Sequence, residues 1–137
     1  MPNPHAHEEL KLLYEVSVKD IEFFKKQQWL VTYYGILVFG ALVTLAKITT
    51  LEKWAFCFVA TLTFLLCSVL LSRLEHSIGV RRARLEAARE GFGKEFNNAW
   101  KAGKKDPECH VVLIFMLLAL LTGTILTILG IIKLYAA

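Results

Sequence analysis

Cysteine, charge inside the hydrophobic segments and catalytic motifs are what this sequence has least of. It has three cysteines in 137 residues: Cys57 and Cys67 lie inside one apolar run, and Cys109 lies just before another. An odd number with two members inside an apolar run argues against a disulfide framework. The sequence contains no Walker loop, no HExxH motif and no GxSxG motif, so nothing in it supplies a nucleophile, a base or a phosphate cradle. We therefore expect no enzyme, no catalytic residue and no cofactor.

The amino-terminal segment also lacks the features of a cleaved signal peptide. Residues 1–5 contain no basic stretch followed by a short apolar segment. We therefore expect the first hydrophobic run to be retained as a transmembrane helix.

Long hydrophobic runs are what the sequence does have. Hydrophobic residues make up 55% of it, and the mean hydropathy is +0.49, whereas soluble domains are about 45–50% apolar. Residues 29–46, 54–72 and 111–132 contain no Asp, Glu, Lys or Arg, and each run is close to the roughly 20 residues that a helix needs to cross a bilayer. Aromatic residues typical of membrane interfaces mark the ends of these runs: Trp29, Tyr33, Tyr34, Trp54 and Tyr135. The sequence predicts an all-α integral membrane protein with three transmembrane helices.

The positions of Lys and Arg predict its orientation. Residues 73–110 carry nine Lys or Arg, residues 1–28 carry four and the linker 47–53 carries two. Because loops rich in Lys and Arg stay inside, we expect the amino terminus and residues 73–110 to be cytoplasmic and the carboxyl terminus to lie outside the plasma (inner) membrane. The net charge of +4 is thereby a topology signal, and we do not expect nucleic acid as a partner.

The pattern divides the chain into four parts. Residues 1–28 predict a cytoplasmic amphipathic helix, because their apolar residues recur at helical spacing: Leu10, Leu13, Tyr14, Ile21 and Phe24. Residues 29–72 predict a transmembrane hairpin with spans 29–47 and 54–72, residues 73–110 a basic cytoplasmic helical region, and residues 111–135 the third transmembrane helix. We expect the first helix to run into its span without a break and the second span to continue past Arg73. Gly91 and Gly93 are expected to kink or interrupt that second helix.

Two small groups could be mistaken for metal ligands. His5, His7 and Glu8 lie near the amino terminus, and Cys109 is followed by His110. A structural site needs four converging ligands, which neither group provides. We interpret them as a solvated terminus and an interfacial pair, and we expect no metal.

An arginine cluster follows the second span. It consists of Arg81, Arg82, Arg84 and Arg89. Basic residues next to a membrane attract anionic lipid headgroups, so the cluster is a candidate contact for lipid or for a cytoplasmic protein partner. The same arginines are also what topology alone would supply.

Small and hydroxylated residues form one face on each predicted span. On the second span these residues are Cys57, Thr61, Ser68 and Ser72, with Glu75 extending the face into the cytoplasm; on the third they are Gly123, Thr127 and Gly130; on the first they are Gly40 and Thr44, between Tyr33 and Lys47. Such residues let helices pack closely in lipid. One interpretation is helix packing within a subunit. The other is that several subunits turn these faces toward a shared axis and line a narrow pore.

The order of the parts resembles a known family. An amphipathic cytoplasmic helix, a tight transmembrane hairpin from Trp29 to Ser72 and a basic cytoplasmic helix from Arg73 are similar to the SLATT-type membrane effectors of bacterial anti-phage and nucleotide-signalling systems. The resemblance covers residues 6–102, and the third span departs from the two-span core. It implies a homo-oligomeric, pore-forming effector in antiviral defence. The alternative function is a non-conducting accessory, anchor or immunity protein that binds a partner protein.

Overall fold

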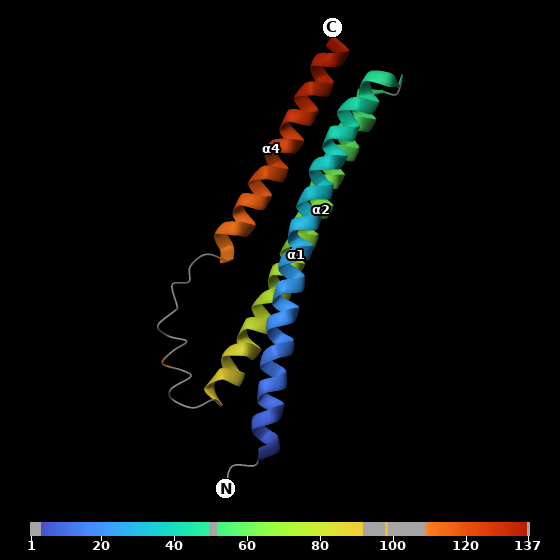
Figure 1. Cartoon of the computed structure of the whole chain (residues 1–137). Coiled ribbons are helices and arrows are strands. Elements are labelled where there is room, and N and C mark those ends of the chain that lie inside the picture. The colour runs from blue at the N-terminus through green and yellow to red at the C-terminus, as the bar shows by residue number, and fades with distance from the viewer. Residues whose placement is uncertain (1–3, 50–51, 92–97, 99–108, 137) are drawn as a thin grey trace.

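The computed structural model describes residues 4–49, 52–91, 98 and 109–136, without the side chains of residues 4–7 and 109. Three long helices make up this part of the chain: α1 (Pro4–Ile48), α2 (Lys53–Glu90) and α4 (Cys109–Ala136) (Figure 1). No strand occurs among these residues. The prediction of an all-α protein is therefore confirmed.

Helices α1 and α2 form a long antiparallel pair. Asp20 contacts Arg81, Gln28 contacts Glu75, and Gly35 lies against Cys67, so residue i of α1 is level with a residue near 102 − i of α2. Helix α1 is unbroken over 45 residues, which corresponds to about 68 Å at 1.5 Å per residue. No Gly or Pro interrupts residues 6–28, and the first helix runs into its span without a break, as expected.

Helix α4 packs along only one half of this pair, the half that ends at the turn between α1 and α2 (Figure 1). The carboxyl terminus lies at the same end as that turn, and the amino terminus lies at the other end (Figure 1). The core of the three-helix half contains Leu71, Leu120 and Ile131, which are fully buried. Its interior is therefore filled by side chains of a single subunit.

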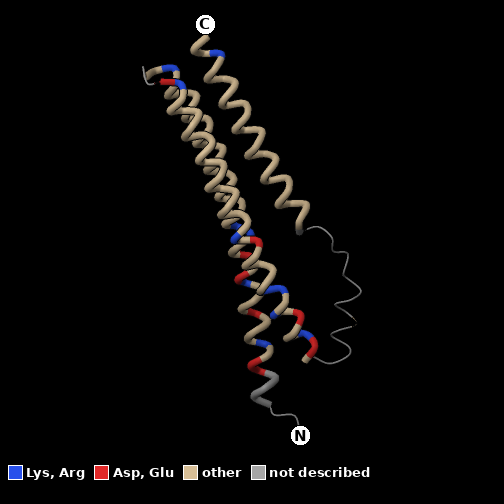
Figure 2. The backbone as a smooth tube through the Cα atoms, turned by 180° about the vertical axis from the view of Figure 1, so that it is seen from behind, with Lys and Arg blue, Asp and Glu red and all other residues tan. Residues whose placement is uncertain are grey.

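The three helices are each long and apolar enough to span a membrane. Figure 2 shows that charged residues gather in the half with the amino terminus and at the extreme opposite end, with an uncharged zone between. In α1 this zone runs from 27 to 46, which corresponds to about 30 Å of helix, the thickness of a bilayer's hydrocarbon core. Large apolar side chains point outward there, including Phe58 (69% exposed) and Phe115 (68% exposed). The prediction of three helices able to span a membrane is confirmed.

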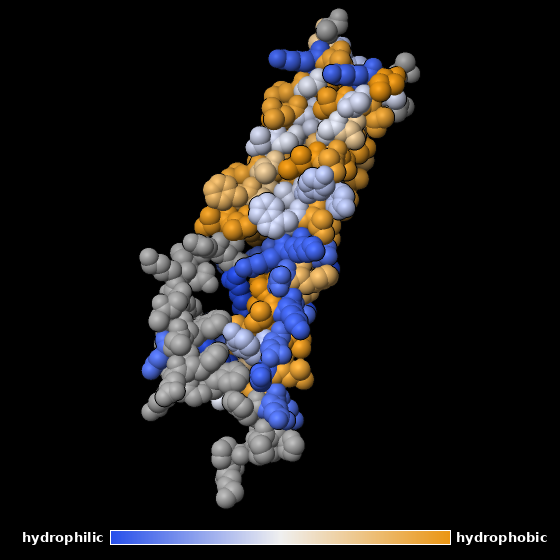
Figure 3. All heavy atoms as spheres, in the orientation of Figure 1, coloured by the Kyte–Doolittle hydropathy of each residue, from blue (hydrophilic) through white to orange (hydrophobic). Residues whose placement is uncertain are grey.

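The outer surface changes character at the boundaries of this zone. In Figure 3 the half of the molecule that contains all three helices is mostly hydrophobic, and most of the hydrophilic side chains lie on the other half, beside hydrophobic ones. Trp29, Tyr33 and Tyr34 are exposed at one boundary, and Trp54 and Tyr135 are exposed at the other. Exposed aromatic residues at both levels are the arrangement that two bilayer interfaces favour.

Helix α2 ends where one of the predicted glycines lies. Gly91 caps it, and its backbone N–H donates to the Ala88 carbonyl at 3.2 Å. A Cβ on Gly91 would lie 2.8 Å from Leu10 Cδ1, so the glycine allows the end of α2 to approach α1 closely. The interruption expected at Gly91 is confirmed, whereas Gly93 lies outside the described residues.

Candidate functional site

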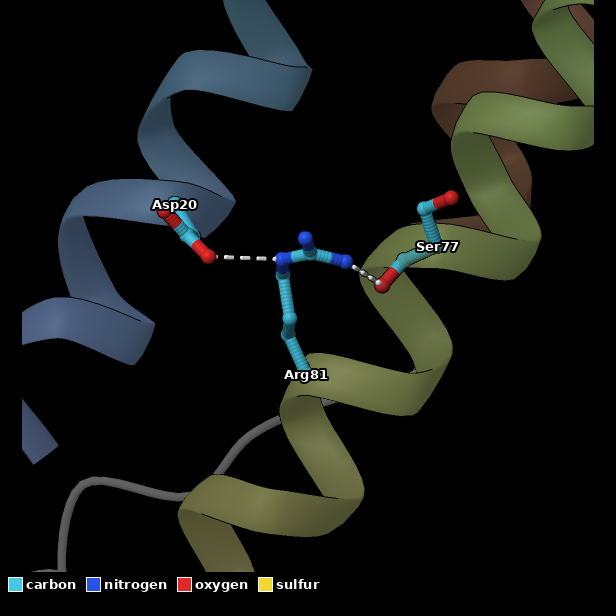
Figure 4. Close-up of polar contacts among 3 residues, drawn as sticks. All are labelled: Asp20, Ser77 and Arg81. Carbon is cyan, nitrogen blue, oxygen red and sulfur yellow. Dashed lines mark hydrogen bonds and ion pairs between the residues drawn. The ribbon is translucent and has the colours of Figure 1, made fainter. Parts of the chain in front are cut away.

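The part of α1 and α2 beyond the uncharged zone is joined by an ion pair. Arg81 Nε donates to Asp20 Oδ2 at 2.8 Å, and Arg81 Nη1 donates to the Ser77 carbonyl at 3.3 Å (Figure 4). The guanidinium also lies 4.3 Å from the centre of the Phe24 ring, a distance typical of a cation–π contact. The side chain of Arg81 is only 25% exposed. Arg81 therefore joins α1 to α2 at this level through both its charge and its packing.

A second polar contact lies at the edge of the uncharged zone. Gln28 Nε2 donates to Glu75 Oε2 at 2.9 Å, and Gln28 is only 5% exposed. The hydroxyl of Thr32, which is also buried, donates to the Gln28 carbonyl at 3.0 Å. A buried amide needs a partner because water cannot reach it. This layer thus joins the two helices at the level where they pass from the charged half to the uncharged half.

The polar face expected on α2 points partly outward. Thr61 and Ser72 are exposed, whereas Cys57 and Ser68 are half-buried. The hydroxyl of Thr61 donates to the Cys57 carbonyl at 2.9 Å, and that of Ser72 donates to the Ser68 carbonyl at 2.9 Å. The Ser68 hydroxyl is buried and has no hydrogen-bond partner in the part of the chain that the structure describes. Bonds to a carbonyl four residues earlier satisfy a hydroxyl locally and do not hold one helix to another.

Residues from this face continue into an open groove. Ser68 and Ser72 line it together with Val69, Arg73 and His76. The groove therefore begins among hydroxyl groups within the uncharged zone and ends at basic side chains just beyond it.

The faces expected on α4 and α1 have different environments. Thr127 of α4 is buried, and its hydroxyl donates to the Gly123 carbonyl at 2.8 Å. Gly130 has open space where a Cβ would lie. On α1, Gly40 likewise has open space, and Thr44 is exposed. The structure thus brings Gly123 and Thr127 into the subunit interior and leaves Gly40 and Thr44 on its surface.

At two glycines the spans lie too close together to admit a Cβ. A Cβ at Gly123 would lie 2.8 Å from Phe39 Cδ2. A Cβ at Gly35 would lie 2.7 Å from Leu120 Cδ2 and 3.2 Å from Cys67 Sγ, so α1, α2 and α4 meet at this one residue. Gly35 was not among the residues predicted from sequence. The available signal was its level in the hairpin, since a turn at 47–53 places residue 35 opposite residue 65, close to Cys67.

The four arginines of the basic cluster do not share one direction. Arg81 faces α1, Arg84 is exposed, and Arg82 is half-buried. Arg89 is half-buried, and its Nε has no hydrogen-bond partner among the residues described. They therefore do not form one open basic patch, and Arg84 is the most accessible of the four.

The described residues contain no group of three or more His, Cys, Asp or Glu that could hold a metal ion. The side chains of His5, His7 and Cys109, which formed the weak candidates, lie outside the described part of the chain. Comparisons of the chain with known protein families, with curated proteins and with solved structures gave no match.

Proposed function

We propose that this chain is a subunit of an oligomeric, pore-forming or channel-like membrane effector that is controlled through its cytoplasmic helices. A role in phage defence, which the resemblance to SLATT-type effectors implies, is part of this proposal. The orientation belongs to it as well: the amino terminus and residues 73–110 are cytoplasmic, and the carboxyl terminus is outside the plasma membrane. Anionic lipid or a cytoplasmic protein contacts Arg84 and its neighbours.

The observation that carries the proposal is the unbroken α1–α2 pair. Both helices extend from the charged half of the molecule into the uncharged zone, and they are joined at the transition by Gln28 with Glu75 and farther out by Asp20 with Arg81. A rigid helix transmits a rotation or tilt along its length because its backbone hydrogen bonds resist bending. A signal received by the charged half can therefore move the spans.

The outward polar side chains support the oligomeric part of the proposal. The core of one subunit is filled, so a pore requires several copies around a common axis. Thr61 and Ser72 are exposed on one side of α2. Their hydroxyls donate within the helix and keep acceptor capacity for water. They are positioned to line a pore between subunits.

Liposome leakage tests this proposal. Reconstituted parent protein should release a small trapped dye, and the double variant Thr61→Leu with Ser72→Leu should abolish the release, because leucine removes the hydroxyls and narrows the space. The control is Val59→Leu, which enlarges an exposed apolar residue (41% exposed) on another side of α2. Release by the double variant at the parental rate would contradict the pore-lining role.

Reporter fusions test the orientation independently. A periplasmically active reporter fused after Ala137 should be active, and the same reporter inserted after Gly91 should be inactive. The reverse pattern would place the charged half of α1 and α2 outside the cytoplasm and remove the basis for cytoplasmic control.

The second candidate is a non-conducting accessory, anchor or immunity protein. The filled core of the single subunit favours it. A parent protein that inserts correctly in liposomes and never releases dye would favour this candidate over the effector.

A further inference from the structure

Helix α1 carries an apolar face outside its span that neither α2 nor α4 covers. Leu12, Val16 and Phe23 are 63%, 48% and 55% exposed, and all three precede the uncharged zone. Their spacing of i, i+4 and i+11 places them within a sector of about 40° on the helix. The buried residues of the same segment, Ser17 and Gln28, point toward α2 on another side. Such a face in water indicates a partner.

Helix α2 presents a face of small residues at the same level. Gly79, Ala83 and Ala87 follow one another at i, i+4 and i+8, and all are exposed. No atom lies within 4 Å of the position that a Cβ would take on Gly79. The antiparallel register places residues 79–87 level with residues 15–23 of α1. Copies inserted in the same orientation therefore hold Val16 and Phe23 of one copy level with the small residues of the next, and Leu12 level with Glu90.

The charges at one edge of each face are complementary. On α1, one edge is mixed and carries the exposed Lys19 and Lys26 together with the exposed Glu8, Glu15 and Glu22. The other edge is acidic and carries Glu9 and Asp20, of which Asp20 also pairs with Arg81 of its own subunit. On α2, Glu90 lies within the face, because 100° per residue places it between Gly79 and Ala83. One edge is mixed and carries the exposed Glu86 with the half-buried Arg82 and Arg89, and the other carries the exposed Arg73 and Arg84. Because α1 and α2 run in opposite directions, an approach of the two faces brings the two mixed edges beside each other. The acidic edge of α1 then lies beside the arginine edge of α2, so this charge pattern favours the pairing.

We propose that copies of this chain assemble head to tail, with the α1 face (Leu12, Val16, Phe23) of one copy packed on the α2 face (Gly79, Ala83, Ala87) of the next. Such a contact uses two different surfaces, so repeating it about an axis along the membrane normal produces a ring when the rotation closes. The inference rests on the oligomeric part of the proposed function and specifies the contact that would build it. The contact would lie in the charged half of α1 and α2, which the proposed function places in the cytoplasm. A signal could tighten or release it there.

Disulfide crosslinking between differently tagged copies tests the pairing. In a parent with Cys57, Cys67 and Cys109 replaced by alanine, one copy carries Val16→Cys and the other carries Ala87→Cys, and both are expressed in the same membranes. Mild oxidant should join the two tags, whereas either variant expressed alone should stay monomeric on denaturing gels. Dimers of the Val16→Cys copy alone would show that two α1 faces meet and would overturn the head-to-tail arrangement. Absence of any crosslink between the tags would overturn it as well.

A matched pair of charge substitutions separates this contact from folding and from the proposed activity. Val16→Glu should lower the yield of oligomer captured by an amine crosslinker about tenfold or more, because it buries a carboxylate without a partner. Val18→Glu adds the same charge at a similarly exposed valine (41%) on another side of α1 and should leave the yield unchanged. Equal loss in both variants, or none in Val16→Glu, would overturn the proposal.

Crosslinked oligomers without dye release would refute the effector function and leave the interface standing. Dye release by Val16→Glu at the parental rate would refute the interface and leave the effector function standing.

Discussion

The two halves of the molecule hold their helices together by different means. In the uncharged half, the hydrogen bonds that the described Thr and Ser hydroxyls donate all go to a carbonyl of their own helix, and the buried Ser68 hydroxyl has no described partner. The helices meet there through close packing at Gly35 and Gly123. In the charged half, polar side chains reach across from one helix to the other, as in the Asp20–Arg81 pair. Close packing at small residues joins the helices of the uncharged half, and paired polar side chains join those of the charged half.

The two halves differ because lipid would surround the uncharged half and water the charged half. Lipid tails are as apolar as the side chains, so the hydrophobic effect does not drive helices together in lipid. Helices associate there where their surfaces pack closely. Water drives apolar residues together, and Ile78 and Leu85 of α2 are accordingly buried beyond the uncharged zone. The charged half can therefore lose a polar contact and remain paired, whereas the uncharged half cannot lose a glycine contact without separating its helices.

The largest expected effect is at the glycine where three helices meet. Gly35→Leu should reduce the free energy of unfolding by about 3 kcal/mol, at the upper end of the usual cost of overpacking, because even a Cβ there would lie 2.7 Å from Leu120 Cδ2. Detergent-induced unfolding followed by circular dichroism measures the change. The control is Gly40→Leu on the same helix, where no atom lies within 4 Å of the added Cβ and a change within about 0.5 kcal/mol is expected. Equal stability of the two variants would show that α4 does not pack on Gly35.

The next effect is at the transition between the halves. Gln28→Leu should cost about 1–2 kcal/mol, because it leaves Glu75 Oε2 without the amide that donates to it at 2.9 Å. Gln27→Leu, at the neighbouring half-buried position, is the matched control and should change the unfolding free energy little. The double variant Gln28→Leu with Glu75→Leu should recover most of the loss, since replacing both partners by apolar residues removes both polar groups of this contact. Failure of this recovery would indicate that Glu75 stabilises the pair through its other contacts instead.

The sequence predicted the helices better than it predicted the contacts between them. Uncharged runs with aromatic ends identify helices able to span a membrane, because the bilayer imposes the same requirement on every span. Whether a small residue contacts another helix depends on how its own helix is rotated about its axis. Periodicity alone does not determine that rotation. The face predicted on α2 therefore mixed the exposed Thr61 with the half-buried Ser68. The sequence likewise grouped four arginines as a candidate contact for lipid or a partner and did not indicate that Arg81 turns toward Asp20.

The smallest expected effect is at the ion pair of the charged half, and it tests whether charge sets register there. Arg81 and Asp20 have side chains that are 25% and 44% exposed, so solvent screens their attraction, and a double-mutant cycle of Asp20→Asn and Arg81→Gln should give a coupling of about 0.5–1 kcal/mol. The cycle cancels the contact of Arg81 with Phe24, because that contact is lost in both the single and the double variant that lack the arginine. Raising the salt concentration from about 0.1 M to about 1 M shortens the screening length from about 10 Å to about 3 Å and should remove most of the coupling. The Gln28–Glu75 contact is more deeply buried, so its coupling should persist at high salt. A coupling between Asp20 and Arg81 that is zero at low salt would mean that burial of Ile78 and Leu85 aligns the helices without help from charge.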